Sequence, residues 1–408
     1  MNLKKTPKNY QTLFLDMNSY FASVEQQVRP NLRGKPAGVT PYPGDTGCVI
    51  ARSYEAKEWG VKTGDMVRDA KRKCPKIEII EARPALYQIY HREILKAIES
   101  CTSNITPLSI DEFAIKLSGS EMSYQSSRNL ALKIKKAIYD VGDWLKCSVG
   151  VGPNRFLAKV AGESKKPDGL TIVKLEELDN FYKSIKLRDI PGINFQMEKC
   201  LARFGIYSAY DFYRKDQFTM SKILKHPGKV WYFRLRGYEV DDFEIETKNC
   251  GHSHVLAPSL RTKESAISVI EKLAHKTAYR LRKGGFLAGG VFVSIHFLRG
   301  GFYHQAKRVS PFSDTTTLVR QIKNLLKGCN WREPILVAIS TFNLVRKQNI
   351  QISIFPEVEK LRQISKALDE VNDTYGADTL YYASMQKGID SAPDRIPFGR
   401  VRYDIRNF

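Results

Sequence analysis

Short stretches in which apolar and polar positions alternate every two residues are separated by longer stretches with helical spacing. In the first half of the chain this pattern predicts strand 11–15, helix 19–28, a helical stripe over 86–98, strands 104–109 and 113–118, helix 125–141 and strand 147–152. When the two helical stretches after the first strand are counted together, the order is β-α-β-β-α-β, the split arrangement of ferredoxin-like sheets. In that arrangement the first strand lies beside the hairpin of the second and third strands, at the centre of the sheet.

The same order of elements returns later in the chain. Residues 248–343 predict strand 252–257, helix 264–283, strands 290–298 and 302–309, helix 315–328 and strand 335–343. Residues 29–82, by contrast, are rich in turn residues and predict a small inserted subdomain. The fold class predicted is therefore α+β, with several domains.

Two short helices joined by a Pro-Gly turn are predicted around residues 187–206. The spacing resembles a helix-hairpin-helix, which binds the sugar-phosphate backbone through main-chain N–H groups of its turn. Pro191, Gly192 and Ile193 form that turn and are predicted to contact DNA. Asn194 stands where such turns have a second glycine, and asparagine tolerates a positive φ. This region is predicted to hold DNA without reading its sequence.

Two adjacent carboxylates, Asp111 and Glu112, lie inside an apolar strand-forming stretch. A buried carboxylate is costly unless cations accompany it. Neighbouring residues on a regular strand point to opposite faces, so the backbone must turn or bulge just before Phe113 for the two to share a ligand. Asp16 ends the first strand and would add a third oxygen ligand for Mg²⁺. The alternative is a helix cap at Asp16 and a surface turn at Asp111-Glu112.

Several residues near these carboxylates suit a phosphate. The helix that starts near Ser19 presents free N–H groups, and Phe21 in its first turn would press against whatever lies behind the phosphate. Tyr54 and Lys57 are one helical turn apart, and Lys166 precedes a Pro-Asp-Gly turn. Ordinary core packing for Phe21 and solvated surface positions for the others explain the same pattern.

Composition favours a nucleic-acid partner. Lys and Arg number 65 against 43 Asp and Glu, a net charge of +22, which points to a polyanion. The second βαββαβ unit lacks an acidic pair and predicts a basic clamp on a nucleic-acid backbone. Its cations are Arg280, Arg282, Lys283, Arg299, Lys307, Arg308, Arg320 and Lys323. His252 and His254 could suggest a metal-binding pair, but a structural role is favoured for two histidines on a strand.

The compartment follows from what the sequence lacks. The seven cysteines are scattered singly, which argues against a disulfide framework and a zinc knuckle and favours a reducing, cytoplasmic environment. No signal peptide is recognisable, and no apolar run approaches the ~20 residues of a membrane span, so no membrane is expected as a partner.

Five motifs taken together resemble the Y-family translesion DNA polymerases, and this ordered set is far more specific than any one motif. They are residues 16–25 (DMNSYFASVE), 47–57 (GCVIARSYEAK), 109–112 (SIDE), 149–152 (VGVG) and 190–193 (IPGI). The tail, with residues 351–355 (QISIF) and 376–383 (GADTLYYA), is similar to the UmuC branch, the catalytic subunit of polymerase V. The resemblance covers nearly the whole chain.

The resemblance implies a right-hand polymerase with a ferredoxin-like palm, small fingers, a helical helix-hairpin-helix thumb and a βαββαβ little finger. The ranges are palm 1–19 and 83–173, fingers 20–82, thumb 174–241, linker 242–247, little finger 248–356 and C-terminal tail 357–408. It also implies that Asp16, Asp111 and Glu112, with the main-chain carbonyl of Met17, hold two Mg²⁺ ions.

The resemblance further implies a nucleotide site. Phe21 matches the steric gate against a 2′-hydroxyl, with Tyr20 beside it, and Tyr54, Lys57 and Lys166 match the triphosphate-binding positions. The family has an arginine where this chain has Lys57, and a lysine does not make the two-pronged contact of a guanidinium.

The partners implied are primer-template DNA and dNTP, a sliding clamp bound through residues 351–355, and UmuD-like and RecA-like proteins. The sequence shows no second acidic constellation for a proofreading exonuclease, so low-fidelity translesion synthesis in DNA damage tolerance is expected. The alternatives are a non-catalytic DNA-binding scaffold of the same fold and a nucleotide cyclase. The scaffold would be expected to lose the carboxylates, and the cyclase would not need a DNA-binding hairpin.

Overall fold

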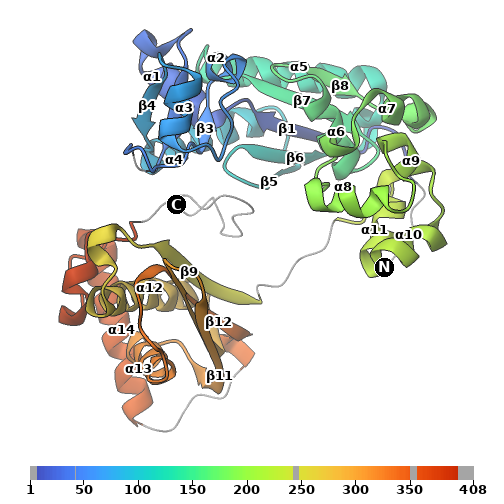
Figure 1. Ribbon diagram of the computed structural model, residues 1–408. Helices are drawn as coiled ribbons and strands as arrows, with labels where there is room; N and C mark the ends of the chain where they lie inside the picture. The colour runs from blue at the N-terminus through green and yellow to red at the C-terminus, as the bar shows by residue number, and fades with distance from the viewer. Residues whose placement is uncertain (1–6, 42, 242–247, 350–355, 394–408) are drawn as a thin grey trace. The chain divides into compact units, whose positions relative to one another are not determined.

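The computed structural model describes residues 7–41, 43–241, 248–349 and 356–393 (Figure 1). The chain divides into two compact units, one within residues 1–243 and the other within residues 244–395, and each is described by itself. None of the described helices is long and apolar enough to cross a membrane.

A five-stranded sheet forms the centre of the first unit, and its strand order is β5-β6-β1-β7-β8. The strands are β5 (Ile105–Pro107), β6 (Glu112–Lys116), β1 (Thr12–Met17), β7 (Cys147–Gly152) and β8 (Leu170–Ile172). The first strand lies beside the hairpin, as the ferredoxin-like prediction requires. The short strand β8, which pairs parallel to β7, was not predicted.

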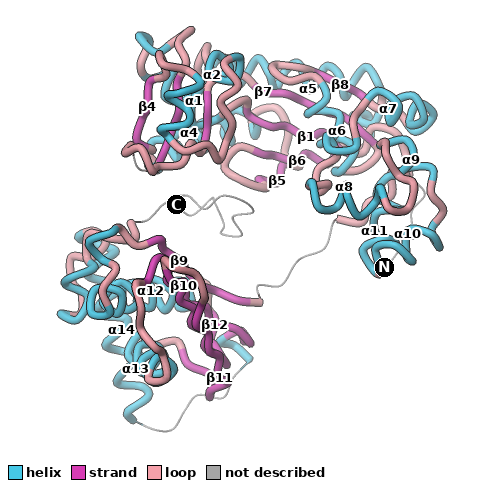
Figure 2. Tube along the Cα trace, viewed as in Figure 1, coloured by secondary structure: helices cyan, strands magenta, loops and turns pink. Residues whose placement is uncertain are grey.

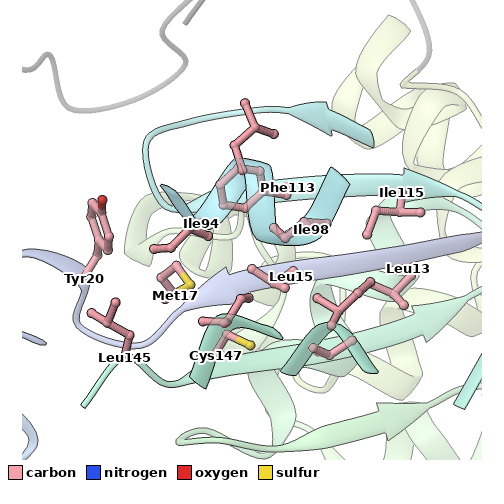
Figure 3. Close-up of a cluster of buried hydrophobic side chains, with 14 of the residues drawn as sticks. Leu13, Leu15, Met17, Tyr20, Ile94, Ile98, Phe113, Ile115, Leu145 and Cys147 are labelled. Atoms are coloured by element: carbon pink, nitrogen blue, oxygen red, sulfur yellow. The ribbon is translucent and has the colours of Figure 1, made fainter. Parts of the chain in front are cut away.

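Helices cover both faces of this sheet. The helices α4 (Pro84–Glu99) and α5 (Tyr124–Val141) contribute Ile94, Ile98 and Ile134 to a core with the strands. Figure 3 shows Ile94 and Ile98 in this core together with Leu15 and Phe113. On the other face, α6 (Arg155–Ser164) packs closely. Gly150 permits this approach, because a Cβ there would lie 1.9 Å from the main-chain oxygen of Ala158.

After α1 (Tyr20–Val28), residues 29–82 form a small three-stranded sheet with its own helices, as the predicted inserted subdomain requires. The strands are β2 (Ala37–Thr40), β3 (Ala51–Arg52) and β4 (Glu78–Glu81), and the helices are α2 (Tyr54–Glu58) and α3 (Val67–Lys73). After β8 the first unit contains only helices and loops among its described residues (Figure 2). These helices are α7 (Leu178–Ser184), α8 (Phe195–Ala202), α9 (Ala209–Arg214), α10 (Gln217–Leu224) and α11 (His226–Leu235).

The second unit has the predicted order of elements, but its strands pair in a different order from those of the first unit. Its strands are β9 (Asn249–Val255), β10 (Phe286–Phe297), β11 (Phe302–Phe312) and β12 (Pro334–Arg346), in the order β11-β10-β12-β9. The helices α12 (Lys263–Lys283) and α13 (Thr315–Leu326) pack on one face. The first strand is thus at an edge here, whereas β1 is central in the first unit.

The segment predicted as a separate tail packs against this second unit. It contains α14 (Pro356–Tyr375) and a 3₁₀ turn at Ala383–Gly388. Lys272 of α12 pairs with Asp378 at 2.9 Å, and Arg282 of α12 pairs with Asp369 at 2.6 Å. The described part of this segment is therefore an integral layer of the second unit.

Candidate active site

The strand pairing brings two of the predicted carboxylates side by side. Leu13, Leu15 and Met17 of β1 point into the core under α4 and α5, so the alternate position, Asp16, points to the face that carries α6. Asp16 is the register partner of Glu112 on β6. Residues directly opposite on antiparallel strands project from the same face, so the two carboxylates meet at the carboxyl end of β1.

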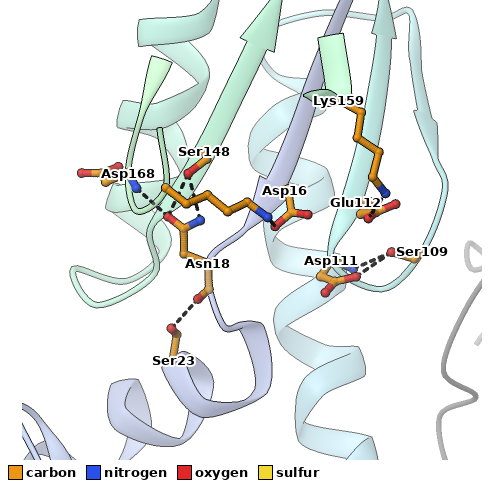
Figure 4. A network of polar contacts seen from close by, with 10 residues as sticks. Asp16, Asn18, Ser23, Ser109, Asp111, Glu112, Ser148, Lys159 and Asp168 are labelled. Carbon is orange, nitrogen blue, oxygen red and sulfur yellow. Dashed lines mark hydrogen bonds and ion pairs between the residues drawn. The ribbon is translucent and has the colours of Figure 1, made fainter. Parts of the chain in front are cut away.

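The third carboxylate comes from the turn between β5 and β6 (Figure 4). The main-chain N–H of Leu108 donates to the carbonyl of Glu112 at 2.9 Å, and the N–H of Met17 donates to the carbonyl of Asp111 at 2.8 Å. The chain therefore turns just before Phe113, as predicted, and Asp111 lies in that turn beside β1. Its carboxylate accepts a hydrogen bond from the Ser109 hydroxyl at 2.6 Å.

A buried histidine fixes the same turn. Nδ1 of His91, on α4, lies 2.8 Å from the carbonyl oxygen of Ile110, and the imidazole stacks on the Phe113 ring with 5.2 Å between ring centroids. Burial lowers the pKa of His91, which favours a neutral ring that donates to this carbonyl. The residue before Asp111 is thereby anchored to the helix layer.

Two lysines pair with two of the carboxylates. Lys166 Nζ lies 2.8 Å from Asp16 Oδ1, and Lys159 Nζ, from α6, lies 2.6 Å from Glu112 Oε1. Within the described residues, no three His, Cys, Asp or Glu side chains are placed so that they could together hold a metal ion. The carboxylates are neighbours, but lysine ammonium groups contact two of them.

The electrostatics of the cluster favour additional cations. Burial raises the pKa of Asp16, and the charge of Lys166 offsets this only in part. Burial, together with the charges of Asp16 and Glu112, raises the pKa of Asp111 to about 6, despite the hydrogen bond from Ser109. Carboxylate oxygens are the ligands that Mg²⁺ prefers. Asp16, Asp111 and Glu112 are not arranged around one point in this structure, but their oxygen chemistry suits divalent metal ions, and Met17, whose side chain is buried, would offer only its main-chain carbonyl.

Lys135 and Asn18 hold the turn that carries Lys166. Lys135 of α5 donates to the carbonyl of Cys147 at 2.7 Å, to the carbonyl of Asp168 at 2.8 Å and to the Asp168 carboxylate at 2.5 Å. The N–H of Asp168 donates to the Asn18 side chain at 2.7 Å (Figure 4). These bonds tie the turn to β7 and to the loop after Asp16.

Phe21 and Tyr20 occupy the first turn of α1. The Phe21 ring stacks on the ring of Tyr87, with 4.5 Å between centroids and 19° between planes. The Tyr20 hydroxyl donates to the carbonyl of Tyr87 at 2.6 Å, and its ring is buried in the core. Phe21 is thus backed by a fixed aromatic ring, while the role of Tyr20 shown by the structure is packing.

Tyr54 and Lys57 lie together on α2. Lys57 Nζ is 3.5 Å from the centroid of the Tyr54 ring. Burial and the charge of Asp16 raise the pKa of Tyr54 to about 12, and burial together with the charges of Arg52 and Lys166 lowers the pKa of Lys57 to about 8. The influence of Asp16 and Lys166 on these two residues links α2 to the carboxylate cluster.

The predicted hairpin is present, but its turn differs in detail. Gly192 has φ +98°, whereas Asn194 has φ −92° and caps α8 by accepting from the N–H of Met197. The expectation that Asn194 substitutes for a glycine of positive φ is therefore wrong, because its side chain is used as a helix cap. Ile193 is buried and its N–H donates to Ile190, so Pro191 and Gly192 form the surface of the turn.

The predicted DNA-binding cations of the second unit fall into two groups. Arg299, Lys307 and Arg308 are exposed on and between β10 and β11. Arg280 and Arg282 lie instead on α12, and the guanidinium of Arg282 binds both the Asp369 carboxylate and the carbonyl of Ser313. These intramolecular contacts account for Arg282 without DNA.

Sequence reasoning missed the residues that contact the carboxylates or support the turns around them. They are Lys159, Lys135, Asn18, Ser109 and His91. Lys159 and Glu163 stand four residues apart on α6, and burial raises the pKa of Glu163 near Lys166 and Lys159. That spacing of opposite charges was the one available signal. Lys135 offered none, because it resembles any other lysine on an amphipathic helix.

Comparisons with known families and proteins match most of the chain. The profile described as the impB/mucB/samB family matches residues 15–163, and the profile of that family's C-terminal domain matches residues 247–354. The DNA polymerase IV of Moorella thermoacetica is 32% identical over 91% of this chain and 95% of its own length. That of Pelotomaculum thermopropionicum is 30% identical over 91% and 94%. These relatives carry the name polymerase IV, so the particular likeness of the tail to UmuC is not confirmed.

Solved structures show a similar fold. A Y-family DNA polymerase chimera of Dbh and Dpo4 superposes with a TM-score of 0.70 at 22% identity and covers 82% of this chain and 99% of its own. A structure titled as an insertion ternary complex of Dbh DNA polymerase gives a TM-score of 0.58 at 23% identity over the same shares. At these identities the likeness concerns the multidomain α+β architecture alone.

Proposed function

The chain belongs to the Y family of DNA polymerases, and from this premise we propose that Asp16, Asp111 and Glu112 are its catalytic carboxylates. It is a DNA-directed DNA polymerase, a nucleotidyltransferase. The specific proposal is that these three residues hold two Mg²⁺ ions while a deoxynucleotide is joined to a primer 3′ end. The observation that carries the proposal is the convergence of Asp16, Glu112 and the Asp111 turn at one end of the sheet.

The carboxylates and lysines have distinct tasks in this proposal. Asp16, Asp111 and Glu112, with the Met17 carbonyl, would hold the metal ions, which when bound lower the pKa of the primer 3′-hydroxyl and neutralise the leaving pyrophosphate. Lys166, 2.8 Å from Asp16, would then contact the triphosphate as a point charge. Phosphoryl transfer needs little covalent help from a protein, so positioning by the fixed turns is the main contribution of the chain.

Nucleotide and DNA surfaces follow from the same premise. We propose that Tyr54 and Lys57 contact the triphosphate and that Phe21, backed by Tyr87, excludes a 2′-hydroxyl. Primer-template DNA would be held by the turn at Pro191 and Gly192 and by cations of the second unit. Those cations are Arg280, Arg299, Lys307 and Arg308.

The family premise also supports a cellular role. We propose low-fidelity synthesis across damaged DNA in the cytoplasm. We also propose that the chain has palm, fingers, thumb and little-finger domains with the ranges stated in the sequence analysis. Residues 351–355, expected to bind a sliding clamp, lie outside the described residues, and UmuD-like and RecA-like partners remain predictions.

Replacement of Asp111 tests the proposal directly. In Asp111→Ala, extension of a primed template with Mg²⁺ and all four dNTPs should be abolished. The site loses the carboxylate whose pKa burial and neighbouring charges raise to about 6, and whose charge a metal ion would stabilise. Binding of the same DNA should be nearly unchanged. Asp140→Ala, which removes an exposed carboxylate from α5, is the matched control and should extend normally. Retained extension by Asp111→Ala would refute the assignment, and a wild-type chain that binds DNA without extending it would favour a non-catalytic scaffold.

A further inference from the structure

Arg52 lies next to the proposed triphosphate site on a rigid piece of backbone. It is the last residue of β3, pairs with Gly38 of β2, and is separated from the first residue of α2 only by Ser53. The Ser53 hydroxyl accepts from the N–H groups of Ala37 at 3.0 Å and Ala56 at 3.3 Å. Arg52 therefore stands at a fixed strand end, two positions before Tyr54 and five before Lys57.

The charge of Arg52 acts directly on Lys57. The charges of Arg52 and Lys166 both act on Lys57 strongly enough to lower its pKa, after burial, and Asp16 is the acid that opposes them. The acid nearest in effect to Arg52 is Asp65, which already binds Lys73 at 2.6 Å and the N–H of Lys62 at 2.7 Å. Lys166 is paired with Asp16 and is also acted on by the charges of Glu163 and Glu112. Arg52 and Lys57 have no carboxylate partner among the described residues, so they are the cations here that a polyanion would neutralise.

The hydrogen bonds of Arg52 are incomplete. Its Nη1 donates to the Thr63 hydroxyl at 2.5 Å. Its Nε is shielded from solvent and has no acceptor among the described residues. Buried donors in proteins are nearly always paired, so an unpaired guanidinium N–H calls for an oxygen acceptor from a ligand. A phosphate oxygen is the acceptor that guanidinium groups bind best, often with two parallel hydrogen bonds.

We infer that Arg52 is a further ligand of the nucleotide triphosphate and supplies the planar, two-pronged contact that Lys57 does not make. This inference rests on the proposed function and deepens it. Lys57 and Lys166 act as point charges, whereas Arg52 fixes the orientation of a phosphate group. The alternative is a structural role, in which Arg52 only connects β3 to the loop at Thr63.

Single-nucleotide insertion kinetics distinguish the two roles. In Arg52→Met, the KM for dNTP should rise roughly 10- to 100-fold, the size expected for a lost charged hydrogen bond, while kcat changes far less. Arg52→Lys should recover only part of the loss. Lys57→Arg in the Arg52→Met background places a guanidinium back in the cluster and should lower the KM again. Arg68→Met, an exposed arginine of α3, is the control and should leave the KM unchanged.

Binding of inorganic tripolyphosphate separates this inference from the proposed function. Tripolyphosphate should raise the thermal unfolding temperature of the wild-type chain and of Arg68→Met, and raise it much less for Arg52→Met. This readout requires no polymerisation, so a chain that fails to extend primers still reports on Arg52. An Arg52→Met variant with wild-type KM and a wild-type response to tripolyphosphate would overturn the inference. So would a loss of stability with both responses intact, which would assign Arg52 a structural role.

Discussion

Asp111 differs from the other two carboxylates in its partners. Asp16 pairs with Lys166 and Glu112 pairs with Lys159, each within 3 Å, while the Asp111 carboxylate accepts a hydrogen bond from the neutral Ser109 hydroxyl. With its pKa near 6, this carboxylate retains a proton more readily than an ordinary aspartate. A cation beside Asp111 would offset both the cost of burying its charge and the repulsion from Asp16 and Glu112. Asp111 is therefore the most informative single position to replace.

The stacking of Phe21 on Tyr87 predicts a sugar-discrimination phenotype. Phe21→Ala should admit ribonucleotides, with the selectivity for dNTP over rNTP falling by at least about tenfold, because no ring then stands in front of Tyr87 to exclude a 2′-hydroxyl. Paired insertion assays with each dNTP and its rNTP measure the ratio. Phe204→Ala, an exposed phenylalanine of the helical region, should keep the wild-type ratio. Unchanged discrimination in Phe21→Ala would remove the gate from this residue.

The lowered pKa of Lys57 predicts a pH dependence of nucleotide binding. Below about pH 8 the ammonium is charged and attracts the triphosphate, and above it the charge is lost. The groups that act on it are Arg52 and Lys166, which disfavour its charge, and Asp16, which favours it. The KM for dNTP should therefore rise as pH increases from 7 to 9.

Lys57→Arg provides the comparison for this prediction, because a guanidinium stays charged throughout that range. The KM of the variant should change less between pH 7 and pH 9 than that of the wild-type chain. Parallel pH profiles for the two proteins would assign the dependence to another group, such as the primer hydroxyl or the substrate.

At the scale of elements, local pattern and long-range pairing contribute differently. Alternation predicted β1, β6 and β7 within a few residues, and their hydrophobic faces fixed which side chains reach the α6 face. The sheet order of the second unit could not be read in the same way, because β9 to β12 repeat the order of elements of the first unit and differ only in pairing. The lysine partners were equally hidden, since they depend on where α5 and α6 pack.

The three hydrogen bonds from Lys135 predict that α5 positions the turn of Lys166. Lys135→Met should release Asp168 from β7, so that the amides of Lys165, Lys166 and Asp168 exchange hydrogen faster and the KM for dNTP rises several-fold with kcat less affected. Lys136→Met, an exposed neighbour on the same helix, should alter neither. Lys135→Arg should restore part of the protection. Wild-type exchange at this turn in Lys135→Met would show that Lys135 is dispensable for its placement.

At the scale of the whole molecule, the contacts of the described residues after 355 place them in the second unit. Residues 357–408 were predicted to form a C-terminal tail. The described part instead covers α12, where Lys272 is only 4% exposed, pairs with Asp378 and donates to the carbonyl of Ile389. A sequence shows the charges of α12 and of this segment but not that they neutralise each other, because the partners stand about a hundred positions apart.

Asp378→Asn tests whether this segment stabilises the second unit. The change leaves the Lys272 ammonium buried beside a neutral amide, and unpairing a buried ion pair typically costs about 3–5 kcal/mol. The lower part of that range is expected, because Asp378 is 24% exposed and the Ile389 carbonyl still binds Lys272. Hydrogen exchange of α12 amides in the full-length chain measures the loss locally. Asp390→Asn, at an exposed site in the same segment, should exchange like the wild type. If Asp378→Asn matches it, the segment only rests on the surface of α12, and deletion of residues 356–393 should then also leave α12 protected.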